Sequence, residues 1–576
     1  MKKYIYGMVA AALCSMSLSS CFNDLDTLPI DDNQVVSEQV YTTVEGYMGV
    51  LAKCYASLIL TGQQGGDGGD GDLEGANEGY SGYVRLLFYL QELTTDNFVM
   101  PSSSNGLRLC LNLTYGPTTA VNTWTYQRLY MSIAYCNEFL RECTEGKLHH
   151  YGLYEHFKDD YLNYRAEARL IRAYCYVMLC DLYGSAPIIH EDADATELPT
   201  PVSREELFKY VESELLAIAG ESDSEDVLAA PGTTLFGHVD KCAAWYLLSR
   251  LYLNAETWIG SNYYQQAYEY SKKIIDSNVY PLASDYRHIF LADNDECSEI
   301  IFPLIQDGLR AQSSAGTNFY VKAFVNGPMD ELYQTGVGSK GWGNVRSKTT
   351  LVDAFDPADV EFDLDDTWGN GKNDKRAQFM TKLETGVDED GNTTYQTKET
   401  WDADLNMTSQ FTCGYGYIKW RNVTKDDQIC ASGDTYTSIN FPLMRTADCY
   451  LMAAEAILRG ANGGRSLALE YVNKVRARAY MSDEYAVAGV SSAVSGKITD
   501  SELTLDFILT ERQKELASEC QRRTDLIRFG KYTSGYNWDW KGGERLGTDV
   551  ESYKVLFPIP EDEITNNPNL DQNYGY

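Results

Sequence analysis

The sequence is poor in the residues and motifs that mark common enzymes. It contains only six histidines in 576 residues, and none of them stands in the H-E-x-x-H pattern of zinc hydrolases. No serine lies in a G-x-S-x-G turn, which excludes the usual nucleophile elbow of esterases. Acidic residues are too numerous to exclude a glycosidase, which needs only two carboxylates at a fixed separation. We nevertheless predict a protein that is not an enzyme and that has no cofactor.

Positive charge is also scarce. Lys and Arg number 48 against 83 Asp and Glu, which gives a formal net charge of -35. Binding to nucleic acid needs clustered cations that neutralise phosphates. The balance therefore excludes a nucleic-acid partner and electrostatic docking on anionic lipid, and we interpret the acidity as a source of solubility.

Paired cysteine motifs are absent. No C-x-x-C occurs among the 14 cysteines, so neither a zinc ribbon nor a redox motif is indicated. Several cysteines lie inside helical apolar patterns, among them Cys54, Cys136, Cys175, Cys180, Cys242 and Cys449. That placement suits small buried hydrophobic residues better than a disulfide framework.

Long apolar runs are absent except at the N-terminus. Lys2 and Lys3 precede an apolar segment from Ile5 to Leu18, which is too short and wrongly flanked for a membrane span. We predict a signal peptide over 1–20. Leu18-Ser19-Ser20-Cys21 resembles a bacterial lipoprotein box with lipid on Cys21, and the acidic residues after it resemble the surface-export signal of Bacteroidetes lipoproteins. The alternative is a plain secretory peptide that ends in an incidental cysteine.

Amphipathic helices dominate the rest of the chain. In the stretch from Tyr161 to Pro187, small and apolar residues such as Ala166, Leu170 and Ala173 recur at helical spacing. Alternating small and bulky residues suit close helix pairs, as in tetratricopeptide-like repeats. Further helices are predicted over 31–60, 122–143, 203–219, 240–257, 263–277, 444–459, 468–479 and within 505–532. We therefore predict a mainly α fold of stacked helix pairs.

The helical period fades between Tyr280 and Thr446. Short β-prone runs appear there, and Asp390-Gly391 between two such runs predicts a hairpin. A loop-rich insertion of this length is more often functional than idle. We predict one domain over 21–576, with a helical scaffold at about 31–60, 120–280 and 441–535 and a loop-rich ligand face at about 61–118 and 280–440.

Aromatic residues are abundant, with 43 Tyr, 19 Phe and 9 Trp. Aromatic rings stack on the apolar faces of sugars, while tyrosine hydroxyls bind polar groups. Trp342 stands between Gly341 and Gly343, far from any apolar pattern. We expect it at a binding site, although a core position remains the alternative, and Phe319 and Tyr320 are weaker candidates.

Two segments identify a family. R-A-E-A-R-L-I-R-A-Y-C-Y-x-x-L-x-D-L-Y-G-x-x-P over 165–187 and E-R-x-x-E-L-x-x-E-x-x-R-R-x-D-L-x-R-F-G over 511–530 resemble the SusD/RagB family of surface lipoproteins in Bacteroidetes glycan uptake. We interpret Arg522, Arg523, Asp525 and Arg528 as a buried charge network rather than as catalytic groups. The resemblance implies the irregular, glycan-facing side on the helical scaffold.

The resemblance also suggests site residues. The segment from Glu78 to Asp96 is similar to one that supplies polar contacts in the starch-binding member of the family, and by position it implies Asn77, Arg85 and Asn105 as glycan ligands, with Trp342 as the stacking ring. Amides and a guanidinium can donate to sugar hydroxyls. An ion pair of Arg85 with Glu78 or Glu92 is the structural alternative. Three aromatic positions of that member are Met100, Ser102 and Ser314 here, so starch is doubtful as the ligand.

An acidic tetrad from Asp293 to Glu296 leaves two interpretations open. Asp293 and Asp295 offer hard oxygen ligands for calcium, whereas a solvated acidic loop needs no ion and is the interpretation we favour.

The resemblance therefore implies a lipid-anchored outer-membrane protein on the cell surface that captures oligosaccharide or polysaccharide. Its partners would be a SusC-like TonB-dependent transporter, to which it delivers the glycan, and surface glycosidases of the same nutrient-uptake system. The alternatives are a peptide-capturing lipoprotein of the RagB branch and a lipid-anchored glycosidase.

Overall fold

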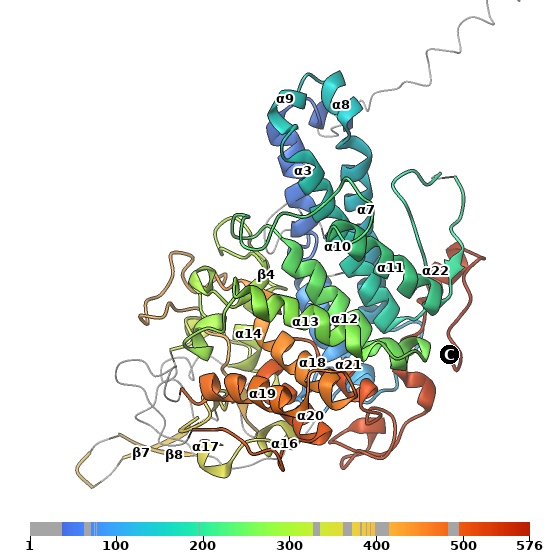
Figure 1. Ribbon diagram of the computed structural model, residues 1–576. Coiled ribbons are helices and arrows are strands. Elements are labelled where there is room, and N and C mark those ends of the chain that lie inside the picture. The colour runs from blue at the N-terminus through green and yellow to red at the C-terminus, as the bar shows by residue number, and fades with distance from the viewer. Residues whose placement is uncertain are drawn as a thin grey trace, which may run out of the picture.

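The computed structural model is mainly helical (Figure 1), as the sequence predicts. It describes residues 37–62, 71–325, 334–360, 371–397, 414–481 and 495–576, apart from positions 74, 77, 195, 381, 382, 388 and 392. The signal segment and Cys21 lie outside these residues. Among the helices of the described ranges, none combines the length and apolarity needed to cross a bilayer.

Helix pairs form the scaffold. In the first half, α3 (Val44–Ala56) packs on α7 (Ala120–Glu142), α7 on α10 (Tyr161–Leu182), and α10 on α11 (Arg204–Ile218). The series continues through α12 (Lys241–Ile259) and α13 (Tyr264–Ser277) to α18 (Thr446–Leu458) and α19 (Arg465–Ala479). Helix α13 packs directly against α18 although a long insertion separates them in sequence, which confirms the predicted stack of pairs.

Small residues allow two of these helices to approach closely. The hydroxyl of Ser249 in α12 lies 2.6 Å from that of Ser271 in α13 and donates to the carbonyl of Ala267 at 2.8 Å. Helix α11 begins at the predicted capping box, in which Ser203 accepts from the Glu206 backbone N–H and the Glu206 carboxylate accepts in return. The local sequence therefore determines where α11 starts. Small residues determine how closely α12 and α13 pack.

One predicted helix is wrong in its extent. The single helix expected over 31–60 is divided in the described part into α2 (Ser37–Val40) and α3, because Thr43 adopts an extended conformation and accepts a hydrogen bond from the Gly46 backbone N–H at 3.0 Å. The threonine side chain caps α3 and so starts a new helix.

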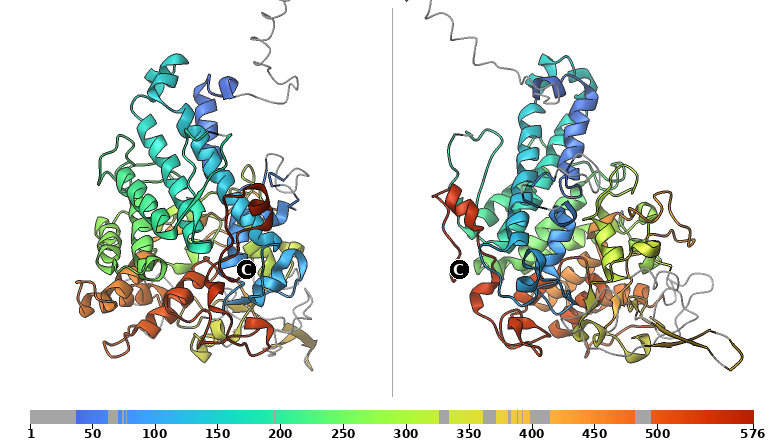
Figure 2. Two further views of the ribbon diagram at one scale, coloured as in Figure 1. Left: turned by 90° about the vertical axis from the view of Figure 1, so that its right-hand side faces the viewer. Right: turned by 180° about the vertical axis from the view of Figure 1, so that it is seen from behind.

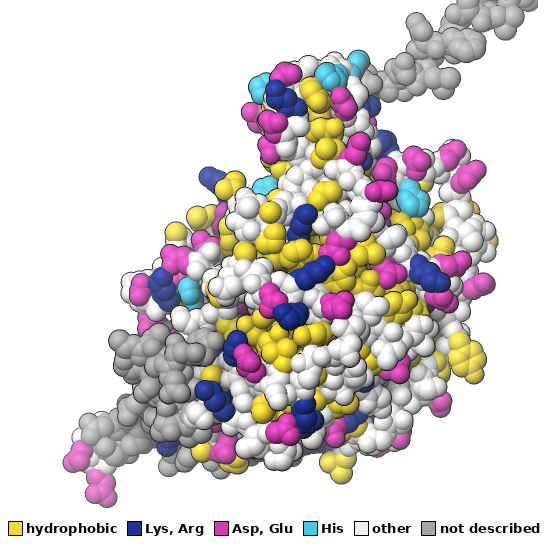
Figure 3. Space-filling view, in the orientation of Figure 1, with side chains coloured by type: hydrophobic (Ala, Val, Ile, Leu, Met, Phe, Trp, Pro, Cys, Tyr) yellow, Lys and Arg dark blue, Asp and Glu magenta, His cyan; other side chains and the backbone are white. Residues whose placement is uncertain are grey.

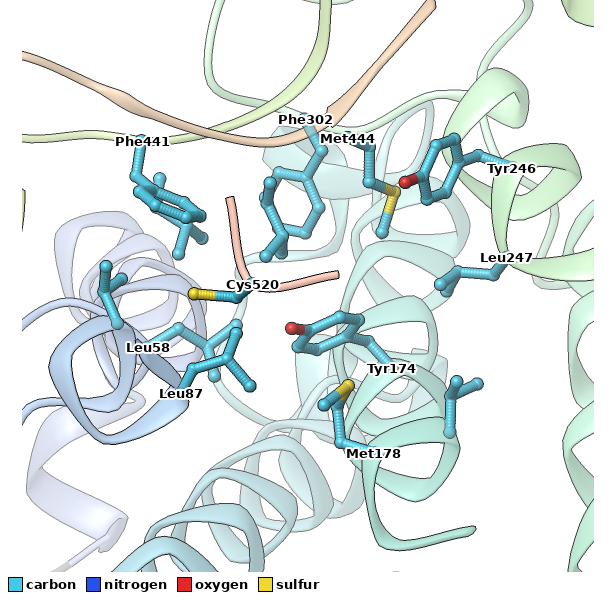
Figure 4. Packing of buried hydrophobic residues seen from close by; sticks show 14 of the residues in the cluster. Leu58, Leu87, Tyr174, Met178, Tyr246, Leu247, Phe302, Phe441, Met444 and Cys520 are labelled. Carbon is cyan, nitrogen blue, oxygen red and sulfur yellow. The ribbon is translucent and has the colours of Figure 1, made fainter. Parts of the chain in front are cut away.

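Long helices α3, α7 and α10 project together from the body, with α8 and α9 at their tip and α2 beside them (Figures 1 and 2). Side chains from α5, α10, α12 and two paired strands converge in the core next to Cys520 (Figure 4). The remaining helices are α4 (Glu78–Ser81), α5 (Tyr83–Gln91), α6 (Leu107–Leu111), α8 (Glu145–His150), α9 (Tyr154–Phe157), α14 (Thr317–Phe324), α16 (Thr349–Val352), α17 (Pro357–Val360), α20 (Leu505–Leu516), α21 (Arg522–Arg528) and α22 (Glu561–Asn566).

Short strands hold the irregular side together. All pairs are antiparallel: β1 (Phe98–Val99) with β5 (Arg346–Ser347), β2 (Ala186–Pro187) with β3 (Pro201–Val202), β4 (Ile300–Leu304) with β10 (Phe441–Arg445), β6 (Phe379–Met380) with β9 (Gly416–Tyr417), and β7 (Leu383–Val387) with β8 (Thr393–Thr397). The last pair is the hairpin that Asp390-Gly391 predicts. Strand pairs join distant segments, so this side has defined positions for side chains.

The C-terminal charges form a buried network, as expected from their spacing. Arg522 binds both carboxylate oxygens of Asp96, at 2.8 and 2.7 Å, and Arg528 binds both oxygens of Glu455, at 2.7 and 2.8 Å. Asp525 accepts from Arg512 and Arg528. These ion pairs hold helices together. Arg523, which was expected in the same network, instead donates to the Val555 carbonyl at 2.6 Å and pairs with no described carboxylate.

Cysteines of the described residues are free thiols. Ten of these eleven are buried and Cys430 is half-buried, in agreement with their interpretation as small apolar residues. Acidic side chains are distributed over the face seen in Figure 3 among basic and apolar ones.

Candidate functional site

Arg85 lies inside a group of aromatic rings. The guanidinium carbon is 4.2 Å from the ring centre of Tyr80, 4.7 Å from that of Phe319 and 5.4 Å from that of Trp342. Tyr89 adds a fourth ring at 5.7 Å. The two residues that the family resemblance pairs, Arg85 and Trp342, are therefore brought together by the fold, and we call the group formed by Arg85, Tyr80, Phe319 and Trp342 the aromatic cage.

Each ring of the cage is carried by a different element. Tyr80 stands on α4 and Arg85 on the buried helix α5. Gly82 lies between them and closely approaches the turn that precedes α14. A β-carbon added to Gly82 would lie 2.4 Å from the Ala315 β-carbon. Only glycine fits this approach without displacement, and it allows α4 and α5 to lie beside α14, which carries Phe319.

Trp342 is held by its backbone. Its N–H donates to the Lys322 carbonyl at 2.6 Å, and the next residues continue this pairing with α14, since the Val345 N–H donates to the Ala323 carbonyl at 2.9 Å. Strand β5 then pairs with β1, which follows α5 in the chain. The tryptophan is thus fixed to both α14 and α5.

Trp342 is neither enclosed in the core nor free in solution. The side chain is half-buried and packs on the core at one side, with its ring centre 6.3 Å from that of Phe319. A core position, the alternative that the sequence left open, would require full burial. The residue therefore stands at the edge of the core and is partly exposed.

Arg85 is 5% exposed and is held by neutral partners. Its Nε donates to the Tyr89 hydroxyl at 2.6 Å, and Nη1 donates to the Gly79 carbonyl. Among the described carboxylates, none forms an ion pair with it. The alternative partner Glu92 instead accepts from the Asn97 side chain at 2.7 Å and from the Cys520 N–H at 2.8 Å, while the side chain of Glu78 is outside the described residues.

The buried charge network also fixes the segment that follows α5, the helix that carries Arg85. Arg522 binds Asp96, one turn beyond α5, and the Lys348 N–H after β5 donates to the Asn97 carbonyl at 2.8 Å. Burial opposes ionisation of Asp96, but the Arg522 guanidinium outweighs it and lowers the pKa of this carboxyl. Burial without a comparable partner raises the pKa of Glu92 to about 8. The segment that carries Arg85 is therefore held by the buried Arg522–Asp96 ion pair and by the backbone hydrogen bond from Lys348 to Asn97.

The other predicted ligands are placed less directly. Asn77 lies outside the described residues. Asn105 is half-buried in a left-handed conformation with φ of 55°, beside the start of α6. No hydrogen bond or ring contact between described residues joins Asn105 to Arg85 or Trp342. Its role in binding stays a prediction.

The family resemblance implies aromatic rings at three positions, and none of the three carries a ring here. Met100 is fully buried, while Ser102 and Ser314 are half-buried. Tyr80, which sequence reasoning missed, supplies a ring instead. No periodicity could have found it, because α4 ends at Ser81 and a separate helix carries Arg85. Phe319 was only a weak candidate and proves to be central to the cage.

The acidic tetrad forms a different group from the predicted one. A His288 nitrogen and carboxylate oxygens of Asp293 and Glu296 lie within 4.8 Å of one another, whereas the predicted ligand Asp295 is exposed and outside this group. Asp293 accepts from the Lys425 N–H at 3.1 Å, and the Lys425 ammonium pairs with Glu296. Calcium prefers six or more oxygen ligands, so two carboxylates with a histidine and a resident lysine fit it poorly.

The cage can bind an uncharged polar ligand with apolar faces. Trp342 and Tyr80 offer ring surface, and Nη2 of Arg85 donates to no described residue, which leaves a planar donor beside the rings. Sugars combine hydroxyl acceptors with apolar C–H faces, and this pairing of donor and ring suits them.

Comparisons with known proteins find a relative that covers the whole chain. A model of the SusD family matches residues 298–576. The starch-binding protein SusD of Bacteroides thetaiotaomicron is 34% identical, over 100% of this chain and 99% of that protein. SusD-like protein P25 of Formosa agariphila is 25% identical over 70% of this chain and 71% of that protein.

Solved structures share the fold. A SusD superfamily protein from Parabacteroides distasonis superposes with a TM-score of 0.63 at 21% identity, covering 94% of this chain and all of that one. The surface glycan-binding protein A of Bacteroides thetaiotaomicron, solved with laminarihexaose, superposes with a TM-score of 0.61 at 19% identity and covers 92% of this chain and 99% of that one.

Proposed function

The chain belongs to the SusD family, and from this premise we propose that it is a non-catalytic lipoprotein of the cell surface that binds oligosaccharide or polysaccharide. Its full-length relative is named a starch-binding protein. A structural neighbour is a surface glycan-binding protein with a bound oligosaccharide. The single observation that supports a glycan as the ligand is the aromatic cage, in which Arg85 lies 5.4 Å from the ring of a half-buried Trp342.

The binding mechanism follows from the cage. Trp342 stacks on a sugar face while the Arg85 fork donates to hydroxyls, and Asn77 and Asn105 orient further hydroxyls. Each contact is weak, so net affinity is micromolar or weaker, roughly 8 kcal/mol at most. The family resemblance implies rings at the positions of Met100, Ser102 and Ser314, and their replacement here weighs against starch as the ligand.

Anchoring and delivery complete the proposal. The described chain begins with α2 at the tip of the projecting helices, whereas α14 and α16 lie toward the opposite end of the molecule (Figure 1). A lipid on Cys21 would tether the protein in the outer membrane from the tip and leave the irregular side free. There it would bind glycan released by surface glycosidases and present it to a SusC-like TonB-dependent transporter.

The test is a binding screen of the full mature chain. Affinity electrophoresis in gels containing amylopectin, inulin, laminarin or xyloglucan, followed by calorimetry with matching oligosaccharides, should identify one class that retards the protein. Trp342→Ala should weaken that retardation. Absence of binding to every glycan, together with calorimetric binding of a peptide digest, would overturn the proposal in favour of peptide capture, and release of reducing sugar on long incubation would contradict the non-catalytic role.

A further inference from the structure

A second pocket lies between α7 and α22, away from the aromatic cage. Its volume is about 310 Å³. Helix α22 comes from the C-terminal end of the chain and lies at the side of the α7 and α11 layer (Figure 1). The residues that line the pocket are Asp72, Leu73, Tyr126, Gln127, Tyr130, Met131 and Glu563.

Tyrosines form the apolar wall of this pocket. Tyr126 and Tyr130 are one helical turn apart on α7, with ring centres 4.9 Å apart. The Tyr130 hydroxyl donates to the Pro187 carbonyl at 3.0 Å, which fixes the orientation of this half-buried ring. The pocket therefore has a rigid aromatic side that costs a ligand little conformational entropy to contact.

Polar groups also line the pocket. The Gln127 side-chain N–H donates to Glu563 Oε1 at 3.2 Å. No described residue donates to Glu563 Oε2, and the Gln127 amide oxygen likewise has no donor among them. Two acceptors thus face a tyrosine wall, and hydroxyl groups of a ligand would satisfy both.

A guanidinium joins this pocket to the cage. Arg128 binds both oxygens of Asp72 at 2.6 Å, and its Nη2 also donates to the Ser81 carbonyl at 2.9 Å. Ser81 directly follows Tyr80, the cage residue nearest to Arg85. One buried guanidinium therefore holds both the Asp72 carboxylate, which lines the pocket, and the backbone next to Tyr80 of the cage.

We propose that this pocket is an accessory saccharide site that binds an uncharged sugar unit of the glycan held at the cage. The inference rests on the proposed function and adds a second subsite to it. Tyrosine faces with carboxylate and amide acceptors match a ring that has apolar C–H groups and several hydroxyl donors. Arg128 pairs with Asp72, whereas no described cation forms an ion pair with Glu563, so the pocket disfavours a uronate or a sulfated sugar.

The experiment compares a long glycan with a short one. The glycan class is taken from the screen of amylopectin, inulin, laminarin and xyloglucan, and the probes are the polysaccharide and its trisaccharide. In the variant Gln127→Ala/Glu563→Ala we expect affinity for the polysaccharide to fall about tenfold, as for the loss of one or two hydrogen bonds, with affinity for the trisaccharide unchanged. Trp342→Ala should weaken binding of both the polysaccharide and the trisaccharide.

Asp562→Ala is the matched control, since Asp562 is exposed on α22 and does not line the pocket. It should bind both probes as the wild type does, and thermal unfolding verifies that every variant is folded. Wild-type affinity of the double variant for the polysaccharide would overturn the accessory site while leaving the cage intact. Failure of the wild type to bind any of the four glycans would overturn the proposed function itself.

Discussion

The guanidinium carbon of Arg85 lies 5.4 Å from the centre of the Trp342 ring, although the two residues stand on α5 and on a loop after α14. Cation–π attraction of this kind contributes more when the pair is desolvated, and Arg85 is almost fully buried. The arginine therefore orders the rings, and the rings present a preformed surface. Preorganisation of this kind lowers the entropy lost on binding.

Trp342→Ala should weaken binding of the glycan. Removing the ring takes away the stacking surface, a loss of ~1–1.5 kcal/mol or roughly five- to tenfold in affinity. Calorimetry with the glycan found by the screen measures this loss. Trp245→Ala is a matched control, because Trp245 is also half-buried but lies on α12 and donates to Glu221 at 3.1 Å. Equal affinity loss in both variants would contradict the role of Trp342.

The features that could be predicted from the sequence are those that a few neighbouring residues determine. Ser203 with Glu206 defines a helix start, and Asp390-Gly391 defines a hairpin, because both are decided within a few residues. The division of the first helix at Thr43 is also local, but a threonine within an apolar pattern gives a weak signal.

The aromatic cage depends on contacts between residues that are far apart in the sequence. The meeting of Arg85 with Trp342 could be anticipated only through the family resemblance, since no spacing links α5 to the loop after α14. Tyr80 and its place in the cage could not be predicted, because Gly82 separates it from α5 and the close approach to Ala315 is a tertiary feature. Local physics therefore predicts the elements, and packing between them decides the site.

Glu515→Ala should destabilise the whole fold. Glu515 is fully buried and accepts from Arg445 at 2.7 Å, from Arg376 at 3.1 Å and from Arg478. Its removal takes one shared carboxylate away from three buried guanidiniums, which costs about 3–5 kcal/mol. Urea unfolding should show this loss, whereas Glu205→Ala, which breaks an exposed pair with Lys209, should change stability by less than about 1 kcal/mol. Similar midpoints for the two variants would be inconsistent with a structural network.

Glu92→Gln should change how stability depends on pH. Burial raises the pKa of Glu92 from 4.5 to about 8, so between these values the folded protein holds a proton that the unfolded chain has released. Stability of the wild type therefore contains a contribution that is full below pH 4.5 and is lost as pH rises toward 8, with a slope of at most about 1.4 kcal/mol per pH unit. The glutamine variant stays neutral and lacks this slope.

Urea unfolding at pH 5, 6, 7 and 8 measures the effect. The variant should gain stability relative to the wild type at each step, because the difference between the two proteins isolates Glu92 from other titrating groups such as Lys348, whose pKa burial lowers to about 7. Parallel pH profiles would show that Glu92 is ionised in the folded protein, compensated by Lys419 and Arg522.

Substitutions at Asn105 separate the effect of its backbone conformation on stability from the effect of its side chain on binding. Its φ of 55° is left-handed, a conformation that glycine adopts freely, asparagine tolerates and alanine resists by about 1 kcal/mol. Asn105→Gly should therefore keep or slightly raise stability, while Asn105→Ala should lower it. If the amide donates to the glycan, both variants bind it more weakly by about the same factor, roughly three- to tenfold for one hydrogen bond. If Asn105 only shapes the turn before α6, the glycine variant binds as the wild type does, and the ligand set is reduced to the cage. Calorimetry on the two variants, with thermal unfolding beside it, distinguishes these results because stability and affinity change independently.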